Sequence, residues 1–198
     1  LLGPGQPPHA KKYYIILPDN IGHGGSSKPS DGMRMKFPRY DYTDMVSAQH
    51  RMLTEKLGVK KPVPILGFGH GQTSWEVAQR PDMTSTQAKV AAATAFKMAG
   101  LKPKDMDVAQ IYDCFTITVL MTLEDYGFAK KGQVGDFVKG GNIEIGGELP
   151  VNTSGGLLSE TGMPGMQLIH EGVRQMRGDA TLQVRNAKHC IVSNQGGV

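Results

Sequence analysis

Short apolar runs alternate along this chain with longer segments in which apolar residues recur every three or four positions. Runs rich in β-branched or aromatic residues at 13–17, 63–68 and 108–112 predict buried strands, and a last run at 189–194 predicts another. Strands that alternate with helices indicate a sheet covered by helices. The pattern therefore predicts the α/β fold class.

Four longer segments have the spacing of amphipathic helices, and a glycine is placed to end each of them. These segments are residues 41–59, 84–100, 116–126 and 166–178. Asp41 or Thr43 is suited to cap the first helix, because a short polar side chain accepts hydrogen bonds from the free amides of the first turn. The glycine-rich stretch 132–150 is expected to be mostly loop.

The stretch from Gly67 to Gly71 has the outline of a hydrolase nucleophile elbow, G-x-S-x-G. Gly69 stands where the serine belongs, so the stretch offers no hydroxyl nucleophile. Either it is an elbow that has lost its nucleophile, or it is a glycine turn of another fold.

Composition narrows the possible functions of this 198-residue chain, which is long enough for one domain or one domain and a fragment. No apolar run is long enough for a membrane span, and the first residues lack a signal-peptide pattern. The net charge of +4 is scattered rather than gathered into a basic stripe, so nucleic-acid binding is not expected. Two cysteines favour a reducing cytoplasm. His23 and His70 have no paired ligand spacing, so neither a metal nor a resident cofactor is expected.

The string YYIILPDNIGHGGSSKPSDGMRMKFPRYDY lies within residues 12–59 and resembles the homoserine O-acetyltransferase branch of the α/β-hydrolase fold. In that family the string forms a strand, a loop and the helix that leads to the nucleophile strand. The resemblance implies an α/β-hydrolase-like fragment over residues 1–60. The serine elbow and its Asp and His partners do not follow it.

The remainder of the chain, residues 62–198, is similar to the C-terminal half of the thiolases, most of all the sterol-carrier or lipid-transfer type. The similarity is carried by the strings RPDMTSTQAKVAAATAFKMAGLKPKDMDVAQIYDCFTITVLMTLEDYGF, VNTSGGLLSETGMPGMQLIHEGVRQMRG and CIVSNQGG. It implies a thiolase-like layered α/β half-domain over residues 61–198. On this interpretation the stretch 67–71 is the strand and turn that open the thiolase region, rather than an elbow.

The thiolase resemblance places a family motif, Asn-Glu-Ala-Phe or His-Asp-Cys-Phe, on Tyr112, Asp113, Cys114 and Phe115. The first residue of the motif helps to hold the thioester oxyanion, and the Tyr112 hydroxyl is able to donate similarly. The alternatives are that Tyr112 only packs its ring, that Asp113 caps the following helix, and that Cys114 is a small apolar residue.

Other catalytic groups of the family are replaced in this chain. Its Gly-His-Pro motif falls on Gly162 to Pro164, where Met163 cannot take the proton that histidine takes. The second catalytic cysteine falls on Ser193 or Asn194, and Cys190 lies several residues too early. The glycines that would approach a thioester are retained, although turn geometry alone also explains them: Gly155, Gly156 and Gly196.

The sequence thus predicts a domain that handles acyl-CoA thioesters without complete thiolase catalysis of its own. Some thiolase relatives act as tyrosine-dependent retro-aldolases with a small zinc-ribbon/OB-type partner subunit, and Tyr112 fits that role. Two alternatives are a hydrolase-type acyltransferase, for which Ser26 and Ser74 have the wrong surroundings, and a non-catalytic fragment. A homo-oligomer is also expected, because a lone thiolase half would leave Val119, Leu120 and Leu123 uncovered.

Overall fold

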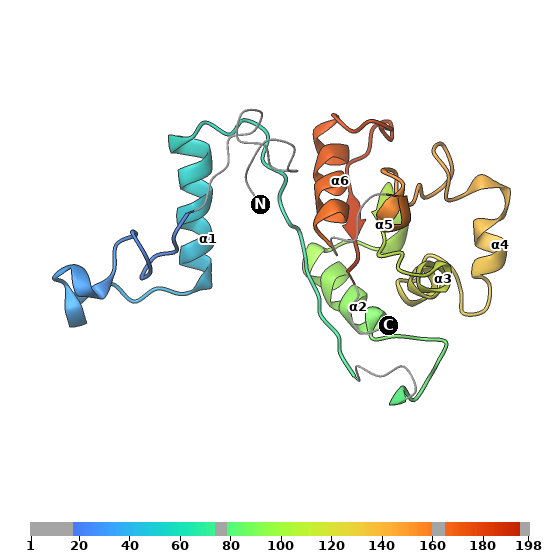
Figure 1. Ribbon diagram of the computed structural model, residues 1–198, viewed down its shortest axis with the longest axis horizontal. Helices are drawn as coiled ribbons and strands as arrows, with labels where there is room; N and C mark the ends of the chain where they lie inside the picture. The colour runs from blue at the N-terminus through green and yellow to red at the C-terminus, as the bar shows by residue number, and fades with distance from the viewer. Residues whose placement is uncertain (1–17, 74–78, 160–164, 195–198) are drawn as a thin grey trace. The chain divides into compact units, whose positions relative to one another are not determined.

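The computed structural model describes residues 18–73, 79–159 and 165–194 (Figure 1). The chain divides into two compact units, Leu1–Pro62 and Val63–Val198. The predicted strand at 13–17 lies outside the described residues. Within the described part of the chain, no helix is both long and apolar enough to cross a membrane.

The first unit is helical in its described part, and its main helix begins where the sequence places a cap. Asp41 Oδ1 accepts hydrogen bonds from the amides of Thr43 (2.8 Å) and Asp44 (3.1 Å), and the Asp41 amide in turn donates to the Asp44 carboxylate. This reciprocal capping box selects Asp41 over Thr43 as the cap. The elements are η1 (Pro29–Asp31), η2 (Arg34–Lys36), α1 (Tyr42–Arg51) and the π-helical η3 (Met52–Lys56).

The second unit is built around two parallel strands. β1 (Val108–Gln110) pairs with β2 (Cys190–Val192) in the register Val108 to Cys190, and Val151 adds a parallel bridge to Ala109 on the other side of β1. The helices around the strands are α2 (Ala88–Ala99), η5 (Pro103–Asp105), α3 (Thr116–Asp125), α4 (Val134–Val138), η6 (Lys139–Gly141), α5 (Gly156–Ser159) and α6 (Met166–Arg177).

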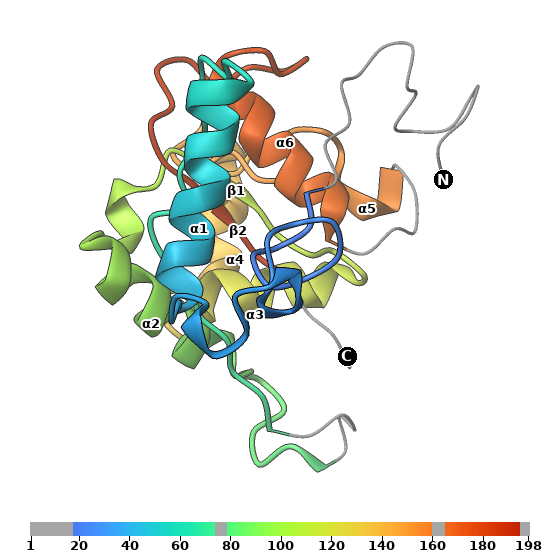
Figure 2. The ribbon, with the colours of Figure 1, turned by 90° about the vertical axis from the view of Figure 1, so that its left-hand side faces the viewer.

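Helices cover both faces of the strands, as Figures 1 and 2 show. Successive side chains of a strand point to opposite faces. Ala109, Ile111 and Ile191 face a core that includes side chains of α3 and α4. On the opposite face, Cys190 and Val192 approach α6 at Gly172, where a Cβ atom would lie 3.0 Å from Val192 and 3.2 Å from the Cys190 sulfur. The arrangement is a helix–sheet–helix sandwich.

Several predicted elements need correction. Residues 63–68 are not a strand, because they have no ladder partner among the described residues. The second helix begins at Ala88 rather than at 84. Ser85 and Thr86 lie before the helix and donate hydrogen bonds to the Asp125 carboxylate. The stretch 132–150 contains α4 and η6 as well as loop.

The predicted uncovered face of α3 is wrong. Leu123 is fully buried and Val119 packs against the same core, so this face is covered within the chain. The exposed apolar residues of this region are Phe115 and Ile117 at the start of the helix. The face of α3 therefore no longer supports an oligomer, and the oligomer itself stays a prediction.

The junction between α3 and α4 is held by the carboxylate of Glu124. Its Oε1 accepts hydrogen bonds from the amides of Gly132 (2.8 Å) and Val134 (3.2 Å), and Lys131 Nζ lies 3.3 Å from Oε2. Desolvation raises the pKa of this carboxyl, but the bonds from Val134, Lys131 and Gly132 outweigh it and leave the pKa below its ordinary value of 4.5.

Glu124 should therefore make the unfolding free energy depend on pH. A lowered folded-state pKa contributes stability that is present above the unfolded pKa and lost as pH falls through the folded pKa. We expect Glu124→Gln to flatten the fall in unfolding free energy below pH 4.5, measured by urea denaturation at several pH values. Glu148→Gln, at an exposed carboxylate, is the control and should leave the slope unchanged; an equal effect of both variants would contradict the assignment.

Candidate active site at the carboxyl ends of the parallel strands

Three polar residues, of which Tyr112 and Asn194 were singled out in the sequence, follow the carboxyl ends of three parallel segments. Tyr112 follows β1, Asn152 follows the Val151 bridge, and Asn194 follows β2. Carboxyl ends of parallel strands meet at one edge, which is where α/β proteins commonly bind ligands. The topology therefore brings the three segments to one end of the sheet.

The motif after β1 holds three side chains in different surroundings. Tyr112 is half-buried, so part of the residue remains accessible. Asp113 is 6% exposed, and its Oδ1 accepts a hydrogen bond from the amide of Leu157 at 2.8 Å. Cys114 Sγ lies 3.5 Å from Thr118 Oγ1 and is part-buried.

The prediction that Asp113 caps the helix after it is wrong. The N-cap residue of α3 is Phe115, and no side chain caps that end. Asp113 instead satisfies an amide at the start of α5, in the loop that follows the Val151 bridge. The Asp113 carboxylate therefore connects the segment after β1 to the segment that begins α5, and it does not cap α3.

Gly155 and Gly156 shape that loop through left-handed backbone, with φ of 101° and 68°. At Gly156 a Cβ atom would lie 2.1 Å from Asp113 Oδ2 and 3.0 Å from Asn152 Nδ2. Only glycine lets these two side chains converge over the loop. Both the positive φ and the close approach of Asp113 and Asn152 therefore require glycine at position 156. Its role as a substrate contact stays a prediction.

Asn194 is exposed at the end of β2, and its side chain lies against Gly165. A Cβ atom on Gly165 would come 1.9 Å from Asn194 Nδ2, so the glycine makes room for this amide. Met163 and Gly196, the other predicted substrate contacts, lie outside the described residues. The predicted substrate contacts with a described position are therefore Gly155, Gly156 and Asn194.

A buried polar network lies behind the site, between the sheet and α6. The Thr153 hydroxyl donates to Glu171 Oε1 at 2.6 Å and accepts from Gln110 Nε2 at 2.9 Å. Gln175 Nε2 also donates to Thr153 Oγ1 and to Glu171 Oε1, both at 2.9 Å. The four side chains are at most 5% exposed. Buried polar groups that share hydrogen bonds in this way fix the position of the segments that carry them, here β1, α6 and the loop after Val151.

Cys190 is not a reactive thiol in this fold. Burial, followed by the nearby Glu171 carboxylate, raises its pKa to about 12. Its sulfur packs against Gly172 of α6. Because the thiolate is the reactive form, this cysteine is unsuited to carry an acyl group at neutral pH.

We expect Cys190 to resist alkylation in the native protein. At pH 8 its thiolate fraction is about a thousandfold below that of an unfolded cysteine with a pKa near 9. Iodoacetamide labelling followed by peptide mass spectrometry, with and without denaturant, measures this protection in a Cys114→Ser background. Equal labelling rates in the two conditions would contradict the burial of the thiol.

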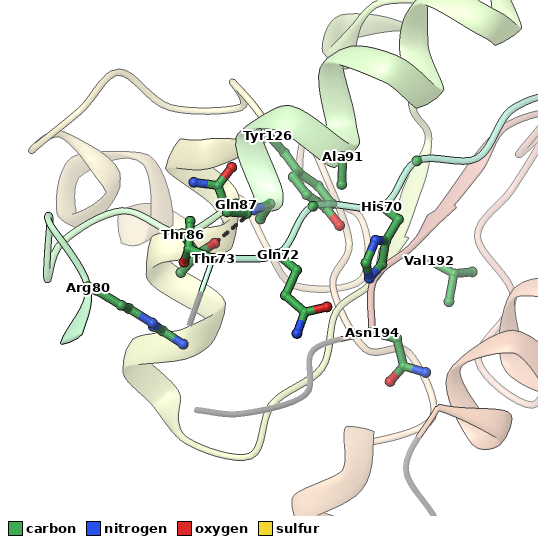
Figure 3. A pocket seen from close by; sticks show the side chains of 13 residues that line it. His70, Gln72, Thr73, Arg80, Thr86, Gln87, Ala91, Tyr126, Val192 and Asn194 are labelled. Carbon is green, nitrogen blue, oxygen red and sulfur yellow. Dashed lines mark hydrogen bonds between the residues drawn. The ribbon is translucent and has the colours of Figure 1, made fainter. Parts of the chain in front are cut away.

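A cavity of about 410 Å³ adjoins Asn194 (Figure 3). One wall is the segment 69–73, and the floor includes Ala91 and Tyr126. Figure 3 shows the side chains of His70, Gln72 and Asn194 around the opening. Burial raises the pKa of Tyr126, so its hydroxyl stays protonated at neutral pH. Sequence reasoning missed this cavity because its walls are about 120 residues apart in the chain.

Three functional candidates were missed by the sequence interpretation: Asn152, Thr153 and Glu171. A polar residue placed directly after an apolar strand-like run was the available signal for Asn152. Nothing local marks Glu171, which lies within an amphipathic helix. Among the described residues, no group of three His, Cys, Asp or Glu side chains is arranged to hold a metal ion.

Comparison with known proteins identifies the family. The family model described as thiolase C-terminal domain-like matches residues 69–198, more than half of the chain. The chain therefore belongs to this family. The predicted thiolase relationship and layered α/β fold class are confirmed for this region. The match leaves out residues 12–59, whose resemblance to homoserine O-acetyltransferases stays a prediction.

Two curated relatives and a solved structure refine the comparison. The chain is 46% identical over 100 residues to a 17-hydroxy-3-oxo-4-pregnene-20-carboxyl-CoA lyase of Mycobacterium tuberculosis, covering 50% of this chain and 26% of the relative. It is 37% identical over 133 residues to a steroid side-chain-cleaving aldolase of Thermomonospora curvata, covering 67% of this chain and 34% of the relative. The structure of an Ltp2-ChsH2(DUF35) aldolase superposes with a TM-score of 0.66 at 35% identity, covering 69% of this chain and 37% of that one. The chain thus spans about a third or less of the curated relatives.

Proposed function

We propose that this chain supplies part of the active site of a thiolase-like carbon–carbon lyase that acts on a 3-hydroxyacyl-CoA thioester. The observation that carries the proposal is Tyr112, half-buried at the carboxyl end of β1 and flanked by backbone that neighbouring loops hold in place. The similarity to a lyase and to a steroid aldolase favours this chemistry over thiolysis.

The proposed reaction is a retro-aldol cleavage. A base takes the proton of the 3-hydroxyl group, the hydroxyl carbon becomes a carbonyl, and the bond between C2 and C3 breaks. The electron pair of that bond enters the thioester as an enolate, which is then protonated at C2. The products are a carbonyl compound and a shortened acyl-CoA. The Tyr112 phenol is suited to transfer one of these protons or to hold the thioester oxygen.

Thiolase chemistry is less well supported by the residues present. It needs a cysteine that carries the acyl group, and the surroundings of the part-buried Cys190 raise the pKa of its thiol to about 12. Cys114 lies beside Thr118, and the resemblance does not align it with the family's nucleophile. Met163 replaces the activating histidine in the sequence.

A partner subunit belongs to the proposal. The chain spans 26% and 34% of the two curated relatives. The related solved aldolase pairs Ltp2 with ChsH2, a DUF35 protein, as its name states. We therefore infer a small partner subunit, and a zinc-ribbon/OB type is the finer expectation. The cavity beside Asn194 has a volume in the range of small-molecule sites and would hold part of the acyl group.

Isothermal titration tests this proposal on the full chain, alone and mixed with a DUF35-type subunit. The ligands are a 3-hydroxyacyl-CoA, the matching acyl-CoA without the hydroxyl group, and free coenzyme A. We expect saturable binding of both thioesters, tighter when the subunit is present, and weaker binding of free coenzyme A. Absence of thioester binding in both preparations would overturn the proposal.

A further inference from the structure

Asn152 has a backbone conformation that asparagine adopts more readily than most residues. In this conformation its side chain reaches the backbone of Ile111. The φ of Asn152 is 52°, in the left-handed region. Its amide donates to the Ala109 carbonyl at 2.9 Å, which continues the bridge from Val151. From there the main chain turns away from β1.

The Asn152 side chain forms hydrogen bonds to the segment that follows β1, beyond the point where the main chain stops pairing with β1. Oδ1 accepts a hydrogen bond from the Ile111 amide at 2.7 Å, and Nδ2 donates to the Ile111 carbonyl at 2.9 Å. One side chain thus satisfies both backbone groups of the residue before Tyr112. Ile111 is itself fully buried, so these two bonds have little competition from water.

Asp113 makes the return connection from the other side of Tyr112. Its carboxylate accepts the Leu157 amide at 2.8 Å, in the loop that carries Asn152. The two side chains meet over Gly156, where a Cβ atom would come within 3.0 Å of both. Each loop therefore holds the backbone of the other, and Tyr112 lies between the two anchored residues.

We propose that Asn152 and Asp113 form a reciprocal latch that positions Tyr112 for the reaction. This inference rests on the proposed function as far as catalysis is concerned. Asn152 and Asp113 act here as positioning residues, since they hold backbone rather than substrate. A small displacement of a catalytic group lowers the rate more than it changes substrate affinity.

The test compares Asn152→Gly with Asn186→Gly. Asn186 also has left-handed backbone, with φ of 58°, and is exposed, so its replacement matches the change in backbone freedom. Asn152→Gly permits the same left-handed backbone and removes the side-chain bonds, and the Asn186→Gly control accounts for the added backbone freedom. We expect kcat for 3-hydroxyacyl-CoA cleavage to fall by about 10- to 100-fold with KM within about threefold, and Asn186→Gly to retain wild-type values.

Amide hydrogen exchange tests the latch without relying on activity. Relative to the Ala109 amide, Asn152→Gly should accelerate exchange at Ile111 by about tenfold, as expected for loss of one hydrogen bond. Exchange at Leu157 should also become faster, because its acceptor Asp113 stays in place but loses the Asn152 side chain beside it. Acceleration at Ile111 alone would overturn the latch, because reciprocity requires Leu157 to respond. Absence of turnover by the wild-type chain together with its partner subunit would contradict the proposed function while leaving this exchange test intact.

If Asn152→Gly fails to fold, amide hydrogen exchange is measured on Asn152→Asp instead. It retains an oxygen for the Ile111 amide, loses the donor to the Ile111 carbonyl, and brings a second carboxylate near Asp113. We expect faster exchange at Leu157 in this variant too, and wild-type exchange there would overturn the latch.

Discussion

Replacing Tyr112 with phenylalanine should lower kcat/KM for cleavage of a 3-hydroxyacyl-CoA by about 100- to 10,000-fold, the range of a lost general acid or base. The substitution removes one oxygen atom and keeps the ring that packs at the end of β1. Thioester binding and the unfolding free energy should therefore stay close to wild-type values. Steady-state kinetics with the chain and its partner subunit, together with urea denaturation, measure these quantities.

Tyr42→Phe is the matched control for this prediction. Tyr42 is 85% exposed at the first position of α1, in the other compact unit. Its variant should retain wild-type kinetics. A Tyr112→Phe protein with wild-type kcat/KM would remove Tyr112 from the chemistry and leave it a packing residue.

The second large effect is expected on stability, at the glycine that occupies the serine position of the apparent elbow. A Cβ atom on Gly69 would lie 1.9 Å from the carbonyl oxygen of Ala91 and 2.9 Å from its Cα. These are backbone atoms of α2, so relief requires movement of the helix rather than of a side chain. We expect Gly69→Ala to lower the unfolding free energy by about 3 kcal/mol, at the upper end of overpacking effects.

Gly135→Ala provides the comparison for this stability measurement. A Cβ atom there would meet nothing within 4 Å, and the residue lies within α4. Alanine is the better helix former, so this variant should be neutral or slightly more stable. If Gly69→Ala were as stable as Gly135→Ala in urea denaturation, the close packing of the segment on α2 would be contradicted.

The packing of Gly69 also explains what the elbow-like stretch is. Gly67, Gly69 and Gly71 would each place a Cβ atom within 2.5 Å of a carbonyl oxygen of α2 or of the residue just before it. Alternate glycines are thus required by close approach to a helix, and no nucleophile position is involved. This agrees with the interpretation of the stretch as the opening of the thiolase region.

Local signals in the sequence predicted much of the second unit. The apolar runs located β1 and β2, the spacing located α3 and α6, and the glycines at 127 and 178 follow those two helices with positive φ. These features depend on residues within a few positions of each other. The family resemblance, carried by long strings, located the Tyr112 motif before any geometry was available.

Features that depend on distant residues were not predictable in this way. The 63–68 run resembles a strand, but a strand also needs a partner, and the described residues supply none. Asp113 looked like the cap of the nearer helix, yet its carboxylate bonds to Leu157, 44 residues away. Asn152 and Glu171 acquire their roles only when the Val151 segment and α6 reach β1.

The most direct test of the central claim is product analysis after incubation of a C3-labelled 3-hydroxyacyl-CoA with the full chain and a DUF35-type subunit, read by mass spectrometry. Carbon–carbon cleavage predicts that the label appears in a free carbonyl compound, in equal amount to a shortened acyl-CoA, and that added coenzyme A does not change the yield. Intact substrate, or a labelled acyl-CoA formed only when coenzyme A is added to a 3-oxoacyl-CoA, would contradict the claim, and the second result would indicate thiolase chemistry instead.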